Sequence, residues 1–349
     1  MRKYILDECD LLEIVDLNGI KIFENATVSN CIPIVRKCHT LNETRIAKID
    51  EQKKISVVFK QNHADLLQDK ENAVWNLTQE KRTSLRHKEM HVLGDYCYIS
   101  VGMVLNADEK TAKGKFVKDD LISLTKDVIH SREYIEAKDI ERYHVKRVRY
   151  LEYGTERCPG QLRRPTFPEL YEQNKLMFNR LGGLQVVLDD VNKYLHSDSM
   201  FSAIKWHDLK NINNKSLMTS VKRYCTMDRK EMESLSMSID LRFLLGILNS
   251  TYAKVLLDDL RGGDYHIYPE HIRKLPIPSA LELQQAPIIS LVNQIINSKK
   301  EDLHADTDKE ESEIDRLVYH LYGLTYDEVL TVDPETTITR EQYEIIKNL

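Results

Sequence analysis

The sequence predicts an α+β protein with a C-terminal helical region, and three patterns lead to that fold class. Between residues 243 and 257, apolar side chains recur at mostly three- and four-residue spacings, which indicates a helix. Residues 96–101 alternate with the period of two that is typical of a strand. After Pro278 the apolar spacing is helical again, and Thr325 with Glu328 forms a capping box for a further short helix. Strands followed by a run of helices favour an α+β arrangement.

The charge of the chain is unevenly distributed along its 349 residues, a length that can hold two or three domains. The formal net charge of −5 does not indicate a nucleic-acid binder. Residues 141–230, however, hold 17 Lys and Arg against 10 Asp and Glu, a balance of +7. Residues 281–349 hold 6 against 15, a balance of −9. A basic middle and an acidic tail suit an anion-binding module followed by a solvated helical region.

Several classes of protein are disfavoured by composition. The six cysteines are scattered without a C-x-x-C pair, which argues against a metal site or a disulfide framework and for reduced thiols. No apolar run approaches the roughly 20 residues that span a bilayer, so we expect no membrane partner. The acidic residues Asp7, Glu8 and Asp10 interrupt the start, unlike a secretion signal. We expect a cytoplasmic protein.

The first 90 residues predict few regular elements. Residues 1–40 predict the end of a helix that includes Leu11 and Leu12, then strands at 13–17 and 30–35. So few elements cannot close a core, and we interpret this region as the edge of a larger α/β domain. Residues 41–90 are polar, with one strand expected at 55–59, and are interpreted as a connecting segment whose basic run at 81–88 is a solvated helix face.

Two stretches of the basic middle are the strongest candidates for contact with nucleic acid. Residues 145–153 are predicted as one strand with Arg147 and Arg149 on the same face, where arginine can contact phosphates and base edges. Arg163 and Arg164 lie on a proline-bounded loop, and a loop on a rigid scaffold often carries function. The alternative interpretation of both stretches is an ordinary charged surface.

Further along, residues 186–190 with 194–197 predict a hairpin. His196 has no Ser, Asp or Cys partner pattern and is interpreted as structural. Trp206 is assigned to the core. Basic residues extend the positive surface through this region, at Lys175, Arg180, Lys205, Lys222 and Arg223.

The stretch at residues 261–278 joins the strands to the helical tail. Gly262-Gly263 is expected to end the preceding helix, because adjacent glycines adopt positive φ without steric cost. An extended segment is expected around Tyr265, stopped by Pro269. The sequence Leu275-Pro276-Ile277-Pro278 predicts a rigid extended exit, because each proline disfavours helix in the residue before it.

The same stretch carries a family resemblance. The helix at 243–250, the pattern Gly-Gly-x-Tyr-x-Ile-x-Pro at 262–269 and the exit at 275–278 resemble the end of a TaqI-like specificity domain. This is the DNA target-recognition part of adenine-N6 methyltransferases and type IIG restriction-modification enzymes. The segments at 134–143 and 171–183 resemble other elements of that domain, and 310–324 resembles the helical tail of type IIG enzymes. In the family the second of these elements is a strand that follows a helix, and Asn174 stands where the family usually has proline. Gly102 resembles a family glycine that permits close backbone approach.

Residues 22–28 and 34–37 resemble the last elements of an adenine-N6 methyltransferase domain. That domain needs a glycine-rich loop for S-adenosylmethionine and an Asn/Asp-Pro-Pro-aromatic motif that holds the flipped adenine, and the sequence contains neither. No arrangement typical of a metal-dependent nuclease is found, and Asp108 with Glu109 lacks a third oxygen ligand. We expect no catalytic residues, cofactor or metal in this chain, and S-adenosylmethionine, with Mg in case of nuclease activity, in a parent enzyme whose catalytic parts precede Met1.

We therefore predict four regions. Residues 1–40 are the last strands of a methyltransferase-like domain, 41–90 a connecting segment, 91–278 a DNA target-recognition domain and 279–349 a C-terminal helical region. The expected partners are double-stranded DNA and an upstream methyltransferase domain, and the chain alone is expected to be inactive. The alternatives are a protein-interaction scaffold that does not bind DNA and an enzyme of unrelated chemistry. The residues expected to contact DNA are Arg147, Arg149, Arg163, Arg164, Lys175, Arg180, Lys205, Lys222 and Arg223.

Overall fold

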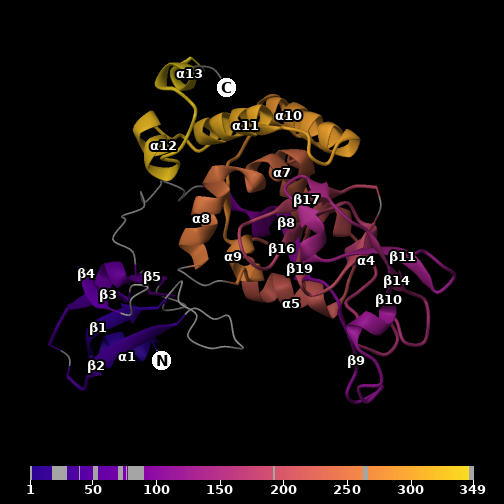
Figure 1. The fold of residues 1–349 in the computed structure, drawn as a ribbon, viewed down its shortest axis with the longest axis horizontal. Coiled ribbons are helices and arrows are strands. Elements are labelled where there is room, and N and C mark those ends of the chain that lie inside the picture. The colour runs from indigo at the N-terminus through magenta and orange to yellow at the C-terminus, as the bar shows by residue number, and fades with distance from the viewer. Residues whose placement is uncertain are drawn as a thin grey trace. The chain divides into compact units, whose positions relative to one another are not determined.

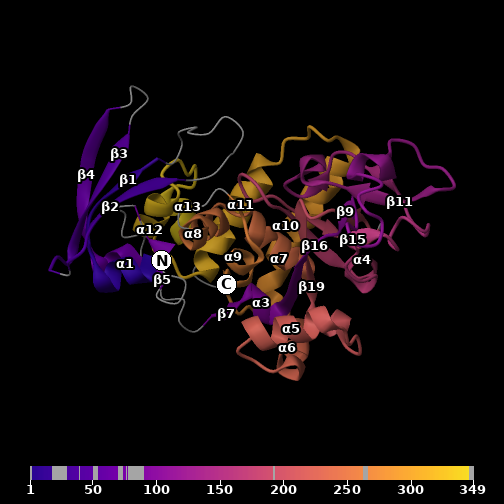
Figure 2. The same cartoon turned by 90° about the horizontal axis from the view of Figure 1, so that it is seen from below.

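The computed structural model describes residues 2–17, 30–38, 40–49, 54–69, 74–75, 77, 90–191, 193–261 and 266–345 (Figures 1 and 2). It is an α+β structure with several small sheets, as the sequence predicts. The chain divides into two compact units, the first made of Met1–Leu85 with Asp258–His266 and the second of Arg86–Leu257 with Ile267–Leu349. Among the described residues no helix has the length and apolar character needed to cross a membrane. The predictions for residues 22–28, 81–88 and 262–265 fall outside the described residues.

The first unit contains a four-stranded sheet of order β2-β1-β3-β4. Strand β1 pairs antiparallel with β2 and parallel with β3, and β3 pairs antiparallel with β4. The elements of this unit are α1 (Arg2–Glu8), β1 (Asp10–Asp16), β2 (Cys31–Arg36), β3 (Glu43–Ile49), β4 (Ile55–Asn62), α2 (His63–Leu66), β5 (Leu67–Asp69) and β6 (Val74–Trp75).

The three strands predicted in this unit are confirmed, with two differences. Leu11 and Leu12 belong to β1 rather than to the preceding helix, because Leu11 is fully buried in the sheet core. Residues 41–62, expected within a connecting segment, supply two strands to the sheet. Leu6 of α1 packs with residues from the sheet and from the segments after β4, namely Leu11, Ile14, Ile46, Phe59, Leu66 and Trp75.

The second unit contains two four-stranded sheets, of orders β17-β16-β19-β8 and β10-β14-β11-β18, and several two-stranded pairs. Its strands are β7 (His91–Val92), β8 (Cys97–Val101), β9 (Val104–Ala107), β10 (Ile122–Ser123), β11 (His130–Ile135), β12 (Ile140–Glu141), β13 (His144–Val145), β14 (Arg149–Glu152), β15 (Leu162–Arg164), β16 (Lys175–Asn179), β17 (Val186–Asp189), β18 (Leu195–His196), β19 (Met200–Lys205) and β20 (Pro276–Ile277).

The helices outside the first unit are short until the C-terminal region. They are α3 (Leu93–Tyr96), α4 (Glu169–Glu172), α5 (Lys215–Tyr224), α6 (Arg229–Leu235), α7 (Leu241–Asn249), α9 (Pro269–Arg273), α10 (Glu282–Glu301), α11 (Asp308–Leu321), α12 (Tyr326–Val332) and α13 (Arg340–Glu344). Helix α8 (Thr251–Arg261) continues from the second unit into the first. The 3-10 turns in the described part of the chain are η1 (Lys118–Leu121), η2 (Ala137–Asp139), η3 (Trp206–Leu209) and η4 (Ser236–Ser238).

Two predictions in the basic middle are wrong. The stretch at 145–153 is not one strand, because β13 ends at Val145 and β14 begins at Arg149 in a different sheet. Residues 186–197 do not form a hairpin either. Strand β17 pairs with β16, whereas β18 pairs in parallel with β11, about 60 residues earlier in the chain. In both cases the pairing partner comes from a distant segment that a local pattern does not reveal.

Gly102 and His196 meet where the two four-stranded sheets approach each other. A side chain at Gly102 would place its Cβ 2.3 Å from the carbonyl oxygen of His196, so the predicted close backbone approach is confirmed. His196 is fully buried, and its ring nitrogens bind the hydroxyl of Ser202 and the carbonyl of Ser197. Burial lowers the pKa of His196 to about 4. The histidine is structural, as predicted.

The helix predicted across 243–257 is two helices, α7 and α8, with extended backbone at Ser250 between them. The side-chain amide of Asn249 explains this interruption. Its Oδ1 accepts from the Val186 amide at 3.0 Å and its Nδ2 donates to the Val186 carbonyl at 2.9 Å, so the side chain completes the edge of β17. Ser250 then caps α8, since its hydroxyl accepts from the amide of Ala253.

Pro269 begins helix α9 instead of ending a strand, as a proline can at the first helical position. The extended exit is confirmed: β20 pairs with β7, almost 190 residues earlier in the chain.

Helices α10 and α11 lie along α7 (Figure 1), and the Cβ of a side chain at Gly246 would lie 2.5 Å from Ile288 of α10. Gly323 has φ +68° and follows α11, as expected. Leu283, near the start of α10, is 85 % exposed.

Candidate nucleic-acid interface

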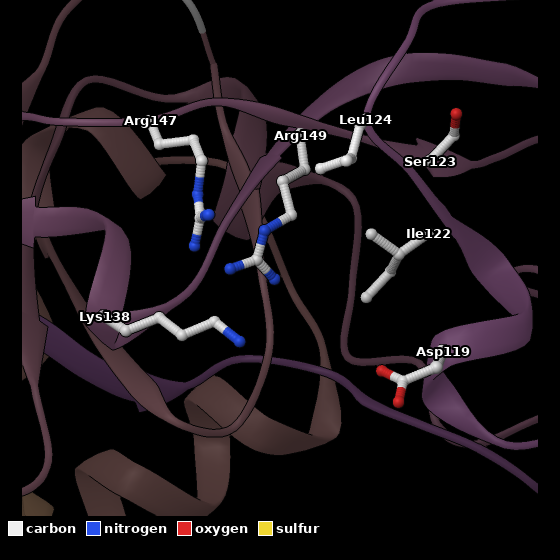
Figure 3. Close-up of a pocket in the computed structure, with 7 residues that line it drawn as sticks. All are labelled: Asp119, Ile122, Ser123, Leu124, Lys138, Arg147 and Arg149. Atoms are coloured by element: carbon white, nitrogen blue, oxygen red, sulfur yellow. The ribbon is translucent and has the colours of Figure 1, made fainter.

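A cationic cavity of about 330 Å³ lies in the second unit beside the sheet that contains β10, β14 and β11. Figure 3 shows the charged ends of Lys138, Arg147 and Arg149 directed into a shared space, with Asp119 across from them. Ile122, Leu124 and the polar Ser123 form the remaining wall. The full lining is Asp119, Ile122, Ser123, Leu124, Lys138, Arg147 and Arg149.

Two buried carboxylates, Glu136 and Asp139, are placed by the η2 turn. The Oδ2 atom of Asp139 accepts from the amide of Glu136 at 2.9 Å, which closes the turn and fixes both side chains. The hydroxyl of Tyr134 donates to Oε1 of Glu136 at 3.0 Å. Glu136 is 4 % exposed and Asp139 is fully buried, so both carboxylates require cationic partners.

Four cations surround these carboxylates, and we call Lys118, Lys138, Arg147 and Arg149 the basic cluster. Glu136 accepts from the Lys118 ammonium at 2.8 Å and from the Lys138 ammonium at 3.1 Å. Arg149 bridges the two acids, with Nη1 2.7 Å from Glu136 and Nη2 2.9 Å from Asp139. Arg147 completes the network, with Nη2 2.9 Å from Oδ1 of Asp139.

The basic cluster carries more positive than negative charge. Four cations against Glu136 and Asp139 leave a formal +2, or +1 when Asp119 on the cavity wall is included. The side chains of Lys118, Lys138 and Arg147 are 41 %, 62 % and 53 % exposed, so these three reach solvent with unused donors. Arg149 is buried and positions its neighbours. The arrangement is suited to binding an anionic oxygen such as that of a phosphate.

Glu136 stays ionised over a wide pH range. Desolvation acts to raise its pKa, but hydrogen bonds from Lys118, Arg149 and Lys138 outweigh it and lower the pKa to about 2. The carboxylate that holds the cations therefore keeps its charge at neutral pH, and the cluster is preformed.

Arg163 and Arg164 lie on β15, which pairs with β9. Both side chains are exposed, and neither takes part in an ion pair or side-chain hydrogen bond within the described ranges 90–191 and 193–261. On α5, Lys222 and Arg223 are also exposed in the last turn, and that helix contains no acidic residue. These four residues present positive charge to solvent on elements other than those of the basic cluster, and their contact with DNA stays a prediction.

Besides the buried Arg149, three more of the predicted contact residues have partners inside the protein. Lys175 has no exposed surface, and its ammonium lies 2.6 Å from Asp189 and donates to the Tyr171 carbonyl at 2.9 Å. It has no surface to offer to DNA, so we leave it out of the proposed interface. Arg180 donates to the Asp198 carbonyl at 2.6 Å and lies over the Phe201 ring. Lys205 donates to the Ile239 carbonyl at 3.3 Å.

Sequence reasoning missed Lys118 and Lys138, which lie outside the most basic stretch. Lys118 comes from η1 and Lys138 from η2, and only the fold brings them to the same carboxylate. The closely spaced acids Glu136 and Asp139, which flank a short turn, are the local signal that could have found the site. Among the described residues, no group of three or more His, Cys, Asp or Glu side chains could hold a metal ion.

Comparison with known proteins gives little further support. No protein-family model matches the sequence, and no curated protein matches it. Among solved structures, the type IIG restriction endonuclease BpuSI superposes with a TM-score of 0.31 at 12 % identity, covering 96 % of this chain and 45 % of that one. The chain thus spans less than half the length of that structure.

Proposed function

We propose that this chain is a sequence-specific duplex-DNA recognition module of a restriction-modification adenine-N6 methyltransferase. The observation that carries the proposal is the basic cluster, a preformed set of cations that outnumbers the two buried carboxylates holding it. Phosphate contacts of this kind fix the position of a protein on the duplex, while base contacts supply specificity. The exposed Arg163, Arg164, Lys222 and Arg223 extend the positive surface.

The sequence resemblance supplies the restriction-modification part of the proposal. The segment at 134–143, which resembles part of a TaqI-like specificity domain, contains Glu136, Lys138 and Asp139 of the cavity region. In the proposed parent enzyme, a methyltransferase domain outside residues 1–349 binds S-adenosylmethionine and performs the transfer. The role of this chain is to hold the duplex so that the target adenine flips towards that domain.

The direct test is a salt titration of duplex-DNA binding by the full chain, followed by fluorescence anisotropy. The logarithm of the association constant is expected to fall linearly with the logarithm of salt concentration. Replacing Lys138 and Arg147 together by alanine removes two phosphate contacts and is expected to reduce the steepness of that line by about 1.8. The matched control is Lys300→Ala, an exposed lysine on the acidic C-terminal region.

The outcomes separate the competing functions. A protein-interaction scaffold predicts no salt-sensitive binding to duplex DNA by the wild-type chain. An unchanged salt dependence in the double variant would remove the basic cluster from the interface. Methyl transfer by the isolated chain with saturating S-adenosylmethionine would show that it contains a catalytic site of its own.

A further inference from the structure

The loop at residues 124–129 exposes large apolar side chains beside the basic cluster. It connects β10 to β11, the two strands that flank β14 in one sheet (Figure 1). Val128 is 96 % exposed and Leu124 is 73 % exposed, so neither contributes to a core. Leu124 also lines the cationic cavity together with Arg147 and Arg149 (Figure 3). Leu124 therefore shares one surface with the cationic groups, and Val128 lies on the same loop four residues further along.

Hydrogen bonds from side chains of the loop and its ends hold the loop backbone in place. Oδ1 of Asp127 accepts from the amides of Ile129 and His130 at 2.8 and 2.7 Å, and Oδ2 lies 2.8 Å from Nδ1 of His130. At the other end, the hydroxyl of Ser123 donates to the Thr125 carbonyl at 2.7 Å. The loop thus exposes Leu124 and Val128 to water. Because its backbone is already ordered, the loop is expected to lose little backbone conformational entropy when it binds a partner.

We infer that Leu124 and Val128 enter a groove of duplex DNA and contact base edges while the adjacent basic cluster holds the phosphates. The occupant follows from the neighbouring charge, because a surface with a formal excess of cations beside apolar side chains matches the phosphates and the apolar parts of bases. In the major groove, the thymine methyl group offers such a contact and distinguishes one base pair from another. The inference rests on the proposed function and adds to it a source of sequence specificity.

The test measures duplex-DNA binding by three variants, Leu124→Ala, Val128→Ala and the double variant, and compares each with the wild-type chain. A preferred site is first selected by the wild-type chain from a library of duplexes with a random core. The double variant is expected to bind that site about 100-fold more weakly, about tenfold for each side chain that no longer becomes buried on binding. Its affinity for an unrelated duplex and the salt dependence are expected to stay unchanged, because no cation is removed.

Leu283→Ala is the matched control, because Leu283 is equally exposed on α10 and is expected to have no effect on DNA binding. Thermal unfolding of the loop variants is expected to match the wild type, since both side chains are exposed. Unchanged affinity for the selected site overturns the inference, as does an equal loss on both duplexes. Binding by the wild-type chain without sequence preference also overturns it while leaving DNA binding intact. If the wild-type chain shows no salt-sensitive binding to duplex DNA, the proposed function itself is wrong, which is a result distinct from failure of the inference about the loop.

Discussion

The second unit holds cations against buried carboxylates in two ways, at the basic cluster and at the Lys175–Asp189 pair. In the pair, one ammonium lies 2.6 Å from one carboxylate, neither side chain has exposed surface, and both charges are buried in the core. In the basic cluster, four cations share two carboxylates and three of them reach solvent. Local sequence does not separate these cases. A structural ion pair differs from a surface able to bind anions in two respects: the number of cations for each carboxylate, and the exposure of those cations to solvent.

Breaking the closed pair is expected to have the largest effect on stability. Lys175→Met leaves the carboxylate of Asp189 buried without a cation, which we expect to cost about 3–5 kcal/mol in free energy of unfolding. Chemical denaturation measures this, with Lys222→Met as the matched control on the exposed face of α5. A loss below about 1 kcal/mol, or one equal to that of the control, would contradict the role assigned to the buried pair.

Acid is expected to weaken the basic cluster through Glu136. Its pKa is about 4.5 in the unfolded chain and about 2 in the folded one, so its stabilisation is complete above pH 4.5 and is lost as the pH falls towards 2. This difference in the pKa of Glu136 corresponds to about 3 kcal/mol in free energy of unfolding. The stability gap between the wild type and Glu136→Gln, measured by denaturation at several pH values, is expected to shrink over this range. A gap that does not change with pH would contradict this assignment.

Arg163 and Arg164 provide a third arrangement, cations without any ion pair within residues 90–191 and 193–261. Replacing both by glutamate is expected to weaken duplex-DNA binding by at least tenfold at low salt, because repulsion replaces attraction at two positions. Fluorescence anisotropy at two salt concentrations measures the change. Unchanged affinity would exclude this strand from the interface and leave the basic cluster as the phosphate-binding surface.

Arg147→Ala is expected to have the smallest effect on stability and a separate effect on binding. Because the Arg147 side chain is 53 % exposed, its loss is expected to change the free energy of unfolding by less than about 1 kcal/mol. The salt dependence of DNA binding is expected to become less steep by about 0.9. A large loss of stability with unchanged salt dependence would make Arg147 a structural residue like Lys175.

Local patterns predicted those elements whose cause is local. The capping box at Thr325 and Glu328 is confirmed, and both of its residues lie within one helical turn. The close approach at Gly102 is confirmed as well, but it was expected from the family resemblance, and its neighbour His196 comes from a distant segment. Trp206 is buried, as its residue type predicted. The division into α7 and α8 was missed because it depends on Asn249 reaching Val186, more than 60 residues earlier. The hairpin at 186–197 was wrong for the same reason, since β18 pairs with β11 instead.

The sequence by itself determined the α+β class, the basic middle, the acidic tail and the resemblance that motivates a DNA-recognition function. Only the tertiary structure decided which cations face solvent. Lys175 and Arg147 are both basic residues of the same stretch. Lys175 is buried in an ion pair with Asp189, whereas Arg147 lies at a cavity with an excess of positive charge. The physical reason is that desolvation and pairing depend on neighbours brought together from distant segments, and a local pattern does not contain those neighbours.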